Sequence, residues 1–224
     1  FLATKITFIN EIANLCEKTG INIEDISLGM GSDTRIGSRF LRAGPAYGGS
    51  CFPKDTKGLI YIADKEKIEL SIVKSVIKSN HNRKSLLLKR IDKILGKNLK
   101  NKKIAFLGVT FKPNTDDMRD AVSLYMIPNL HKKKAIISYY DPTGEKKEFS
   151  KLKNCFFYSD INDALKDTDL IILHTEWDEF KSLDFKTLRK KKNFIIYDLR
   201  NLYNVNQMKK NKIKYFSIGR PPTN

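Results

Sequence analysis

Apolar residues in the first part of the chain recur at the three- and four-residue spacing of amphipathic helices. The helical stretches lie at residues 6–16, 22–28, 59–62 and 70–95. Gly20 and Gly96 follow the first and the last stretch as stop signals. Residues 29–53 contain too many glycines and prolines for regular structure. We therefore predict an all-helical region over residues 1–96 that is interrupted by one long loop.

From Lys102 onward, short apolar runs bounded by turn residues alternate with helical stretches. The runs lie at 104–109, 135–140, 170–173, 194–197 and 215–218, with helical stretches that include 121–130, 162–166 and 204–210. Strands that alternate with helices in this way form parallel sheets with right-handed crossovers. The predicted fold class is α/β, with a helical region at 1–96 followed by a Rossmann-like parallel-sheet domain at 97–224.

Arginines follow the last two apolar runs of this second region, as Arg200 and Arg220. A parallel sheet binds its ligands at the carboxyl ends of its strands. Arg200 is therefore a candidate ligand-binding residue.

Composition and charge narrow the classes of function. Hydrophobic residues make up 41% of the chain, and no apolar run approaches the ~20 residues that span a bilayer. We therefore expect a globular, cytoplasmic protein with no membrane partner. The net charge is +17, but the lysines are scattered and gather at predicted helix ends, where cations favour the helix dipole. Because no aromatic and basic stacking motif accompanies this charge, we predict no nucleic-acid partner.

The three cysteines do not form a disulfide framework, since their number is odd. Cys16 and Cys155 lie in apolar stretches and are interpreted as small buried hydrophobes. Cys51 differs because it lies in a glycine-rich loop. No metal site is predicted, because no ligand spacing relates the cysteines to the three histidines, His81, His131 and His174.

The segment from Gly44 to Asp55 carries the strongest chemical signal. Gly48 and Gly49 let the backbone approach a ligand closely. Cys51 follows, and a lysine and a helix start nearby would favour its thiolate. Asp55 is placed either to orient water or to be the N-cap of that helix. On these residues alone, a nucleophilic cysteine and a structural loop with an incidental cysteine both remain open.

The run Gly-Gly-Ser-Cys-Phe-Pro-Lys-Asp at 48–55 resembles the nucleophile motif of the UDP-glucose/GDP-mannose dehydrogenase family. Further resemblances follow in the family's order over almost the whole chain, at residues 1–12, 33–40, 108–123, 174–177 and 197–201. The first resembles the family's central dimerisation helix and the second a substrate-contacting segment. The last three resemble parts of its nucleotide-sugar domain.

The resemblance implies oxidation of UDP-glucose to UDP-glucuronate by two hydride transfers to NAD. It also implies a homodimer that forms through the first helix. Cys51 would attack the C6 aldehyde to give a thiohemiacetal and then a thioester, which water hydrolyses. Asp55 would assist proton transfer to or from water. Related dehydrogenases act on GDP-mannose or UDP-N-acetylhexosamines and share the cysteine loop, so these substrates remain alternatives.

The same resemblance assigns contacts to individual residues. The substrate would meet Arg35 from the partner subunit, the side chains of Phe40, Leu41, Phe111, Lys112 and Arg200, and the backbone of Tyr47 and Gly48. NAD would meet Lys54 and Arg119 across the domain cleft. Two structural alternatives stay open: Lys112 and Arg119 could pair with nearby aspartates, and Phe40 could belong to the core.

The family's dinucleotide-binding fingerprint, Gly-x-Gly-x-x-Gly after a strand, does not occur in these 224 residues. The chain also begins at Phe1 and its first residues already have a helical pattern. We therefore expect a fragment that lacks the N-terminal NAD-binding domain, binds a UDP-sugar and does not complete the oxidation alone. A non-catalytic sugar-nucleotide-binding or dimerisation module is the alternative from another functional class.

Overall fold

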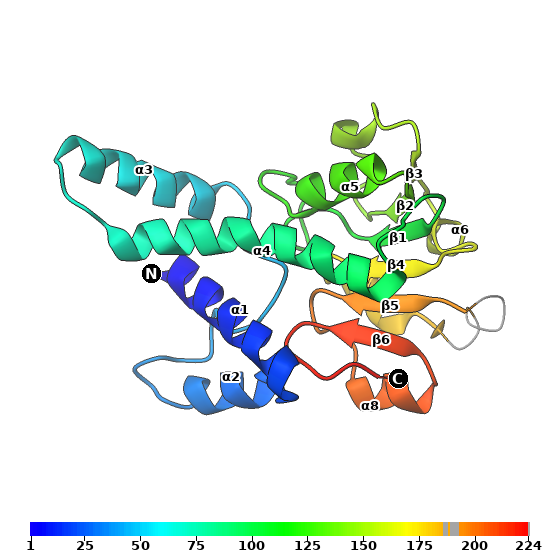
Figure 1. The fold of residues 1–224 in the computed structure, drawn as a ribbon, viewed down its shortest axis with the longest axis horizontal. Helices are drawn as coiled ribbons and strands as arrows, with labels where there is room; N and C mark the ends of the chain where they lie inside the picture. Colours follow the sequence, from blue (N-terminus) through cyan, green and yellow to red (C-terminus); the bar gives the residue numbers. More distant parts are fainter. Residues whose placement is uncertain (186–187, 189–192, 224) are drawn as a thin grey trace.

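The computed structural model describes residues 1–185, 188 and 193–223, which form a helical region and a sheet domain (Figure 1). The helical region contains α1 (Leu2–Thr19), α2 (Ile23–Gly31), α3 (Cys51–Lys65) and α4 (Ser71–Leu95). Helix α4 is 25 residues long and continues from the helical region onto the sheet domain, while α3 folds back beside its first half (Figure 1).

The sheet domain is built on six parallel strands in the order β3-β2-β1-β4-β5-β6. The strands are β1 (Lys103–Leu107), β2 (Ile136–Tyr140), β3 (Cys155–Phe157), β4 (Leu170–Leu173), β5 (Ile195–Asp198) and β6 (Lys214–Ser217). The described helices between them are α5 (Ser123–Lys132), α6 (Ile161–Ala164), α8 (Val205–Lys210) and the short 3₁₀ helices η1 (Lys147–Phe149) and η2 (Asp178–Ser182). This Rossmann-like order confirms the predicted α/β fold class, and it reverses direction between β1 and β4, where such sheets bind ligands.

Both faces of the sheet are covered, which explains why its strands are continuous apolar runs. All four residues of β4, Leu170 to Leu173, are buried. Ile104 and Phe106 of β1 face a core shared with α1, α4 and α5, whereas Ala105 and Leu107 face a second core with η2 and α8. The first core extends without a break into the helical region, because α4 covers part of the sheet as an ordinary crossover helix would.

A polar clasp joins the helical region to the far end of the sheet domain. Glu17 of α1 forms an ion pair of 2.6 Å with Arg90 of α4, and its other oxygen accepts the Gly219 N–H at 2.8 Å. The Gly219 carbonyl in turn accepts the Ile23 N–H at 2.8 Å. Burial raises the pKa of Glu17, and the Arg90 charge opposes that shift. The clasp fixes the two halves of the chain relative to each other.

Helix α3 begins earlier than predicted, and this changes the interpretation of two site residues. Cys51 is the first residue of α3 and lies on the helix rather than in the loop. Pro53 does not end the loop, because a proline in the first helical turn loses no hydrogen bond. Asp55 is consequently inside α3, and its alternative interpretation as an N-cap is wrong; Ser50 occupies that position.

One further prediction about helices needs correction. Helix α5 starts at Ser123 rather than at Ala121, so Arg119 precedes the helix by a full turn.

The apolar stripe of α1 is largely covered within the chain, since Ile9, Ala13 and Cys16 are buried. A different face of α1, which carries Phe8 and Leu15, is exposed.

Candidate active site

Cys51 is solvent-exposed at the start of α3, with its sulfur 3.7 Å from the Ser50 hydroxyl. The loop that delivers it packs on the connection between β1 and α5. The Gly49 N–H donates to the Arg119 carbonyl at 2.8 Å. A Cβ on Gly49, whose φ is +80°, would lie 2.6 Å from the Phe111 ring. The thiol is therefore held beside the segment that follows the first strand of the sheet.

Gly48 lies where the cysteine loop comes closest to the connection between β1 and α5, and there is no room for a side chain there. A Cβ there would lie 2.5 Å from the Asp120 carbonyl oxygen, a main-chain atom that cannot rotate away. The two glycines thus allow the two loops to pack closely against each other. The predicted reason for them, close approach to a ligand, is different. Ligand contact by the Gly48 backbone stays a prediction.

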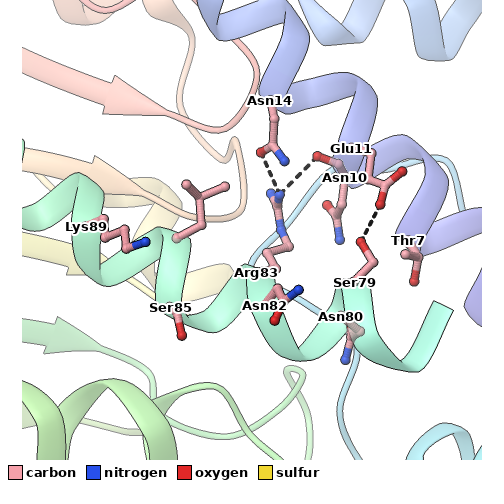
Figure 2. A pocket seen from close by; sticks show the side chains of 11 residues that line it. Thr7, Asn10, Glu11, Asn14, Ser79, Asn80, Asn82, Arg83, Ser85 and Lys89 are labelled. Carbon is pink, nitrogen blue, oxygen red and sulfur yellow. Dashed lines mark hydrogen bonds between the residues drawn. The ribbon is translucent and has the colours of Figure 1, made fainter. Parts of the chain in front are cut away.

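Three buried polar residues hold the segment before Cys51, and sequence reasoning missed all of them. The Gly44 N–H donates to Asn10 Oδ1 at 2.8 Å, and the Gly44 carbonyl accepts from Arg83 Nε at 2.7 Å. Asn80 bonds both main-chain groups of Tyr47, at 2.9 and 3.1 Å. Figure 2 shows Asn10, Asn80 and Arg83 along the facing sides of α1 and α4. Helical spacing could have revealed two of them, because Asn80 and Arg83 lie on the same face of α4 as the buried Val76 and Leu87.

An aromatic cluster adjoins the cysteine. The Phe52 ring stacks edge-on with Phe40 at 6.1 Å and with Tyr47 at 6.0 Å between ring centroids. Phe40 is 40% exposed and is not a core residue, so its surface is open to a ligand. Leu41, by contrast, is 2% exposed with its side chain in the core, and its carbonyl accepts the Ser27 hydroxyl at 2.8 Å. Its predicted contact with the substrate stays a prediction.

Arg200 ties together the carboxyl ends of β1, β4 and β5. It donates to the His174 carbonyl and to the Phe111 carbonyl, both at 2.8 Å, and pairs with Glu176 at 3.0 Å. The main chain of Arg200 is held by Asp198, which accepts its N–H at 2.8 Å. The predicted strand-end arginine thus lies at the switch point of the sheet. Lys112 nearby is exposed, with its ammonium 5.4 Å from the centroid of the Phe111 ring.

His174 at the end of β4 is a structural residue. Its Nε2 accepts the Ser123 N–H at 3.0 Å, and its Nδ1 donates to Thr175 Oγ1, which itself donates to the Thr110 carbonyl. Burial lowers the pKa of His174 to about 3, with a contribution from the Arg200 charge, so the ring is neutral at physiological pH. The histidine anchors the start of α5 to the sheet.

A cavity of ≈620 Å³ opens beside the cysteine loop and brings both predicted NAD contacts together. Its lining residues come from the cysteine loop and from α3, α4 and the start of α5, and include Lys54, Lys57, Lys84, Arg119 and Asp120. Arg119 hydrogen-bonds Asp117 at 2.8 to 3.1 Å, which raises the pKa of its guanidinium, and Cys51 is close enough to contribute to this shift. Lys54 pairs with Asp55 at 3.2 Å on the exposed surface.

The side chain of Arg35 pairs with a residue of its own loop. Arg35 pairs with Asp33 at 2.6 Å, and its side chain is 87% exposed. Lys5 of α1 donates to the carbonyls of Ile36 and Gly37 and so holds this loop against the first helix. The predicted action of Arg35 on a partner subunit requires an exposed side chain, which this position provides.

No group of three or more potential ligands lies close enough to hold a metal ion among residues 1–185, 188 and 193–223. Over the same residues, no helix has both the length and the apolar character needed to cross a membrane.

Together, the fold and the site define a Rossmann-like α/β protein with an accessible thiol beside its ligand-binding edge. The chain belongs to the UDP-glucose/GDP-mannose dehydrogenase family. The family's central-domain model matches residues 1–82, and the model of its UDP binding domain matches residues 105–205. The predicted domain boundary at 96/97 falls in the stretch between these two matches and stays a prediction.

Known relatives match almost the whole chain. It is 43% identical to UDP-glucose 6-dehydrogenase of Rhizobium meliloti, covering 99% of this chain and 51% of that protein. The corresponding enzyme of Rickettsia prowazekii is 44% identical, with 98% and 51% covered. A solved UDP-glucose dehydrogenase from Pyrobaculum islandicum matches with a TM-score of 0.85 at 28% identity, covering 98% of this chain and 48% of that one. The chain spans about half the length of the curated relatives it matches.

Proposed function

We propose that this chain carries the thiol and the nucleotide-sugar site of an NAD-dependent enzyme that oxidises UDP-glucose to UDP-glucuronate. The observation that carries the proposal is the exposed Cys51 at the head of α3, held by Gly49 against Phe111 at the switch-point edge of the sheet. UDP-glucose is preferred over other nucleotide sugars because relatives of 43% and 44% identity bear that substrate in their names. A cytoplasmic location accompanies this proposal and stays a prediction.

The proposed chemistry assigns Cys51 the covalent step. Its sulfur adds to the C6 aldehyde and forms a C–S bond, and the aldehyde oxygen takes a proton to give a thiohemiacetal. Oxidation of this adduct leaves a thioester, which water hydrolyses to the carboxylate and the free thiol. Asp55, one turn further along α3 and exposed, would receive the proton of the attacking water. Retention of the aldehyde on sulfur keeps it from escaping between the two oxidations.

The cation-lined cavity beside Cys51 fits one end of a dinucleotide. Lys54 and Arg119 lie on its wall and would contact the phosphates, and Gly49 and Ser50, which directly precede Cys51, line the same cavity. When bound, NAD supplies the oxidant for both steps. We expect the residues that hold the rest of the cofactor to lie outside these 224 residues, so the chain alone is not expected to reduce NAD.

The substrate would lie between the aromatic cluster and the sheet edge. Phe40 offers an exposed ring for the sugar, and the Tyr47 backbone is held in place by Asn80. Lys112 offers an exposed point charge for the diphosphate. Arg200 is already engaged with two carbonyls and would contribute by holding Phe111 in position as much as by direct contact.

Alkylation of Cys51 by iodoacetamide tests this proposal on the chain itself. UDP-glucose at ten times its Kd is expected to slow the reaction about tenfold, because only the free protein reacts. Mass spectrometry reads each thiol separately, and the buried Cys16 serves as the internal control. A Lys112→Gln variant should need more UDP-glucose for the same protection.

Two outcomes of this experiment would count against the dehydrogenase. An unchanged rate of Cys51 alkylation at saturating UDP-glucose would show that this ligand does not bind beside the thiol. Binding of UDP-glucose detected by calorimetry, without protection, would favour the non-catalytic binding module.

We further propose a homodimer through the exposed face of α1. Phe8 and Leu15 lie seven residues apart on this face and are 45% and 59% exposed. A stripe with heptad spacing suits pairing with a second helix. Sedimentation velocity should show a dimer that Phe8→Glu dissociates. Phe156→Glu, at a matched 46% exposure on β3, should leave the dimer intact, and a monomeric parent chain would disprove the proposal.

A further inference from the structure

The cavity beside Cys51 contains two cations to which the family resemblance assigns no role. Lys57 lies one turn after Lys54 on the same face of α3, and Lys84 lies in the middle of α4. The side chains therefore converge on one space from different helices. Lys54 and Arg119 each have a carboxylate partner, Asp55 and Asp117.

Among the residues that the structure describes, neither Lys57 nor Lys84 forms an ion pair within 4.0 Å. Asp120 lies near enough to favour the charged form of Lys84, but burial and the Lys57 charge outweigh it and lower the pKa of the Lys84 ammonium. Two like charges are thus held near each other at the wall of an open cavity, with one exposed carboxylate to balance them. An anion that enters the cavity would relieve this repulsion.

We infer that Lys57 and Lys84 bind the diphosphate of the dinucleotide, together with Lys54 and Arg119. A lysine ammonium is a point charge with three rotatable donors, which suits phosphate oxygens. Two ammonium groups beside one carboxylate leave a net positive charge, which the two phosphates of a dinucleotide would neutralise. This inference rests on the proposed function, in which the cavity receives NAD, and it extends the diphosphate contacts from two residues to four.

Calorimetry with inorganic pyrophosphate at low ionic strength tests the inference on the chain itself. Lys84→Gln is expected to weaken binding about tenfold, the loss of one charge-assisted contact, and Lys84→Arg to restore most of it. Lys57→Gln should act in the same direction and less strongly, because Lys57 is more exposed. The effect of each variant should shrink as added salt screens the charges.

Lys89→Gln is the matched control. Lys89 is also a lysine of α4, but it is exposed and borders the cavity between α1 and α4 that Figure 2 shows, not the cavity that Lys84 lines. Its loss should leave pyrophosphate affinity unchanged. Amine labelling read by mass spectrometry should likewise find Lys84 protected by pyrophosphate and Lys89 unprotected.

The inference is overturned if Lys84→Gln binds pyrophosphate as tightly as the parent chain, or if Lys84 and Lys89 are protected to the same degree. Its failure is distinguishable from that of the proposed function. Absence of Lys84 protection while UDP-glucose still protects Cys51 would remove the diphosphate contact and leave the enzyme assignment intact. Lys84 protection without Cys51 protection would do the reverse.

Discussion

Asp198→Ala is expected to lower the free energy of unfolding by about 4 kcal/mol, the largest stability effect that we predict. The Asp198 carboxylate is fully buried and accepts four hydrogen bonds at 2.7 to 3.1 Å. The donors are the N–H groups of Arg200, Leu202 and Tyr203 and the hydroxyl of Tyr215. Each buried donor left without an acceptor costs about 1–3 kcal/mol, and partial entry of water reduces the sum.

Chemical denaturation of the variant gives the measurement, and Asp178→Ala gives the control. Asp178 has an 86% exposed side chain that pairs with Lys181 on the surface, so its loss should change stability by no more than about 0.5 kcal/mol. Equal effects of the two substitutions would contradict the assigned role of Asp198. Because Asp198 also holds the main chain of Arg200, the variant should weaken UDP-glucose protection of Cys51.

Gly48→Ala is expected to displace the cysteine loop and to cost about 2–3 kcal/mol. The new methyl group would lie 2.5 Å from the Asp120 carbonyl oxygen, so either the loop or the start of α5 must move. The loss of UDP-glucose protection at Cys51 should exceed what the stability change alone explains. Alkylation rates and denaturation curves on the same variant provide both numbers.

Gly58→Ala is the matched comparison, since Gly58 lies within α3 and a Cβ there meets nothing within 4 Å. Alanine is favoured over glycine inside a helix by about 1 kcal/mol, so this variant should be more stable than the parent chain. UDP-glucose should protect its Cys51 normally. A Gly48→Ala variant that behaves like Gly58→Ala would contradict the close packing described here.

Much of the architecture could be predicted from the spacing of apolar residues. The run from Leu170 to Leu173 matched β4 to the residue, and the other four runs lay within two residues of their strands. The start of α3 could not be placed, because Pro53 reads as a breaker until its position in the first turn is known. The shared core was also missed, since periodicity does not reveal that α4 covers both its own region and the sheet.

The residues of the candidate site also differ in how far the sequence alone could identify them. Cys51 and Arg200 could be singled out from the sequence because a glycine-rich loop and a strand end are local features, and their roles stay predictions. The clamp formed by Asn10, Asn80 and Arg83 joins residues more than thirty positions apart, so only the folded chain brings it into view. Leu41 was assigned by resemblance to a family segment, and such a match does not tell which way its side chain points.

Helix α4 has one further consequence for how the site behaves. Asn80 and Lys84 lie four residues apart in α4, so they are neighbours on one side of the same helix. Asn80 hydrogen-bonds the backbone of Tyr47, which precedes Cys51, while Lys84 lines the cavity beside the cysteine loop. A rigid-body shift of α4 would therefore carry the Asn80 hydrogen bonds to Tyr47 and the Lys84 side chain together. Ligand binding at Lys84 and the position of the segment before Cys51 are thus linked through a single helix.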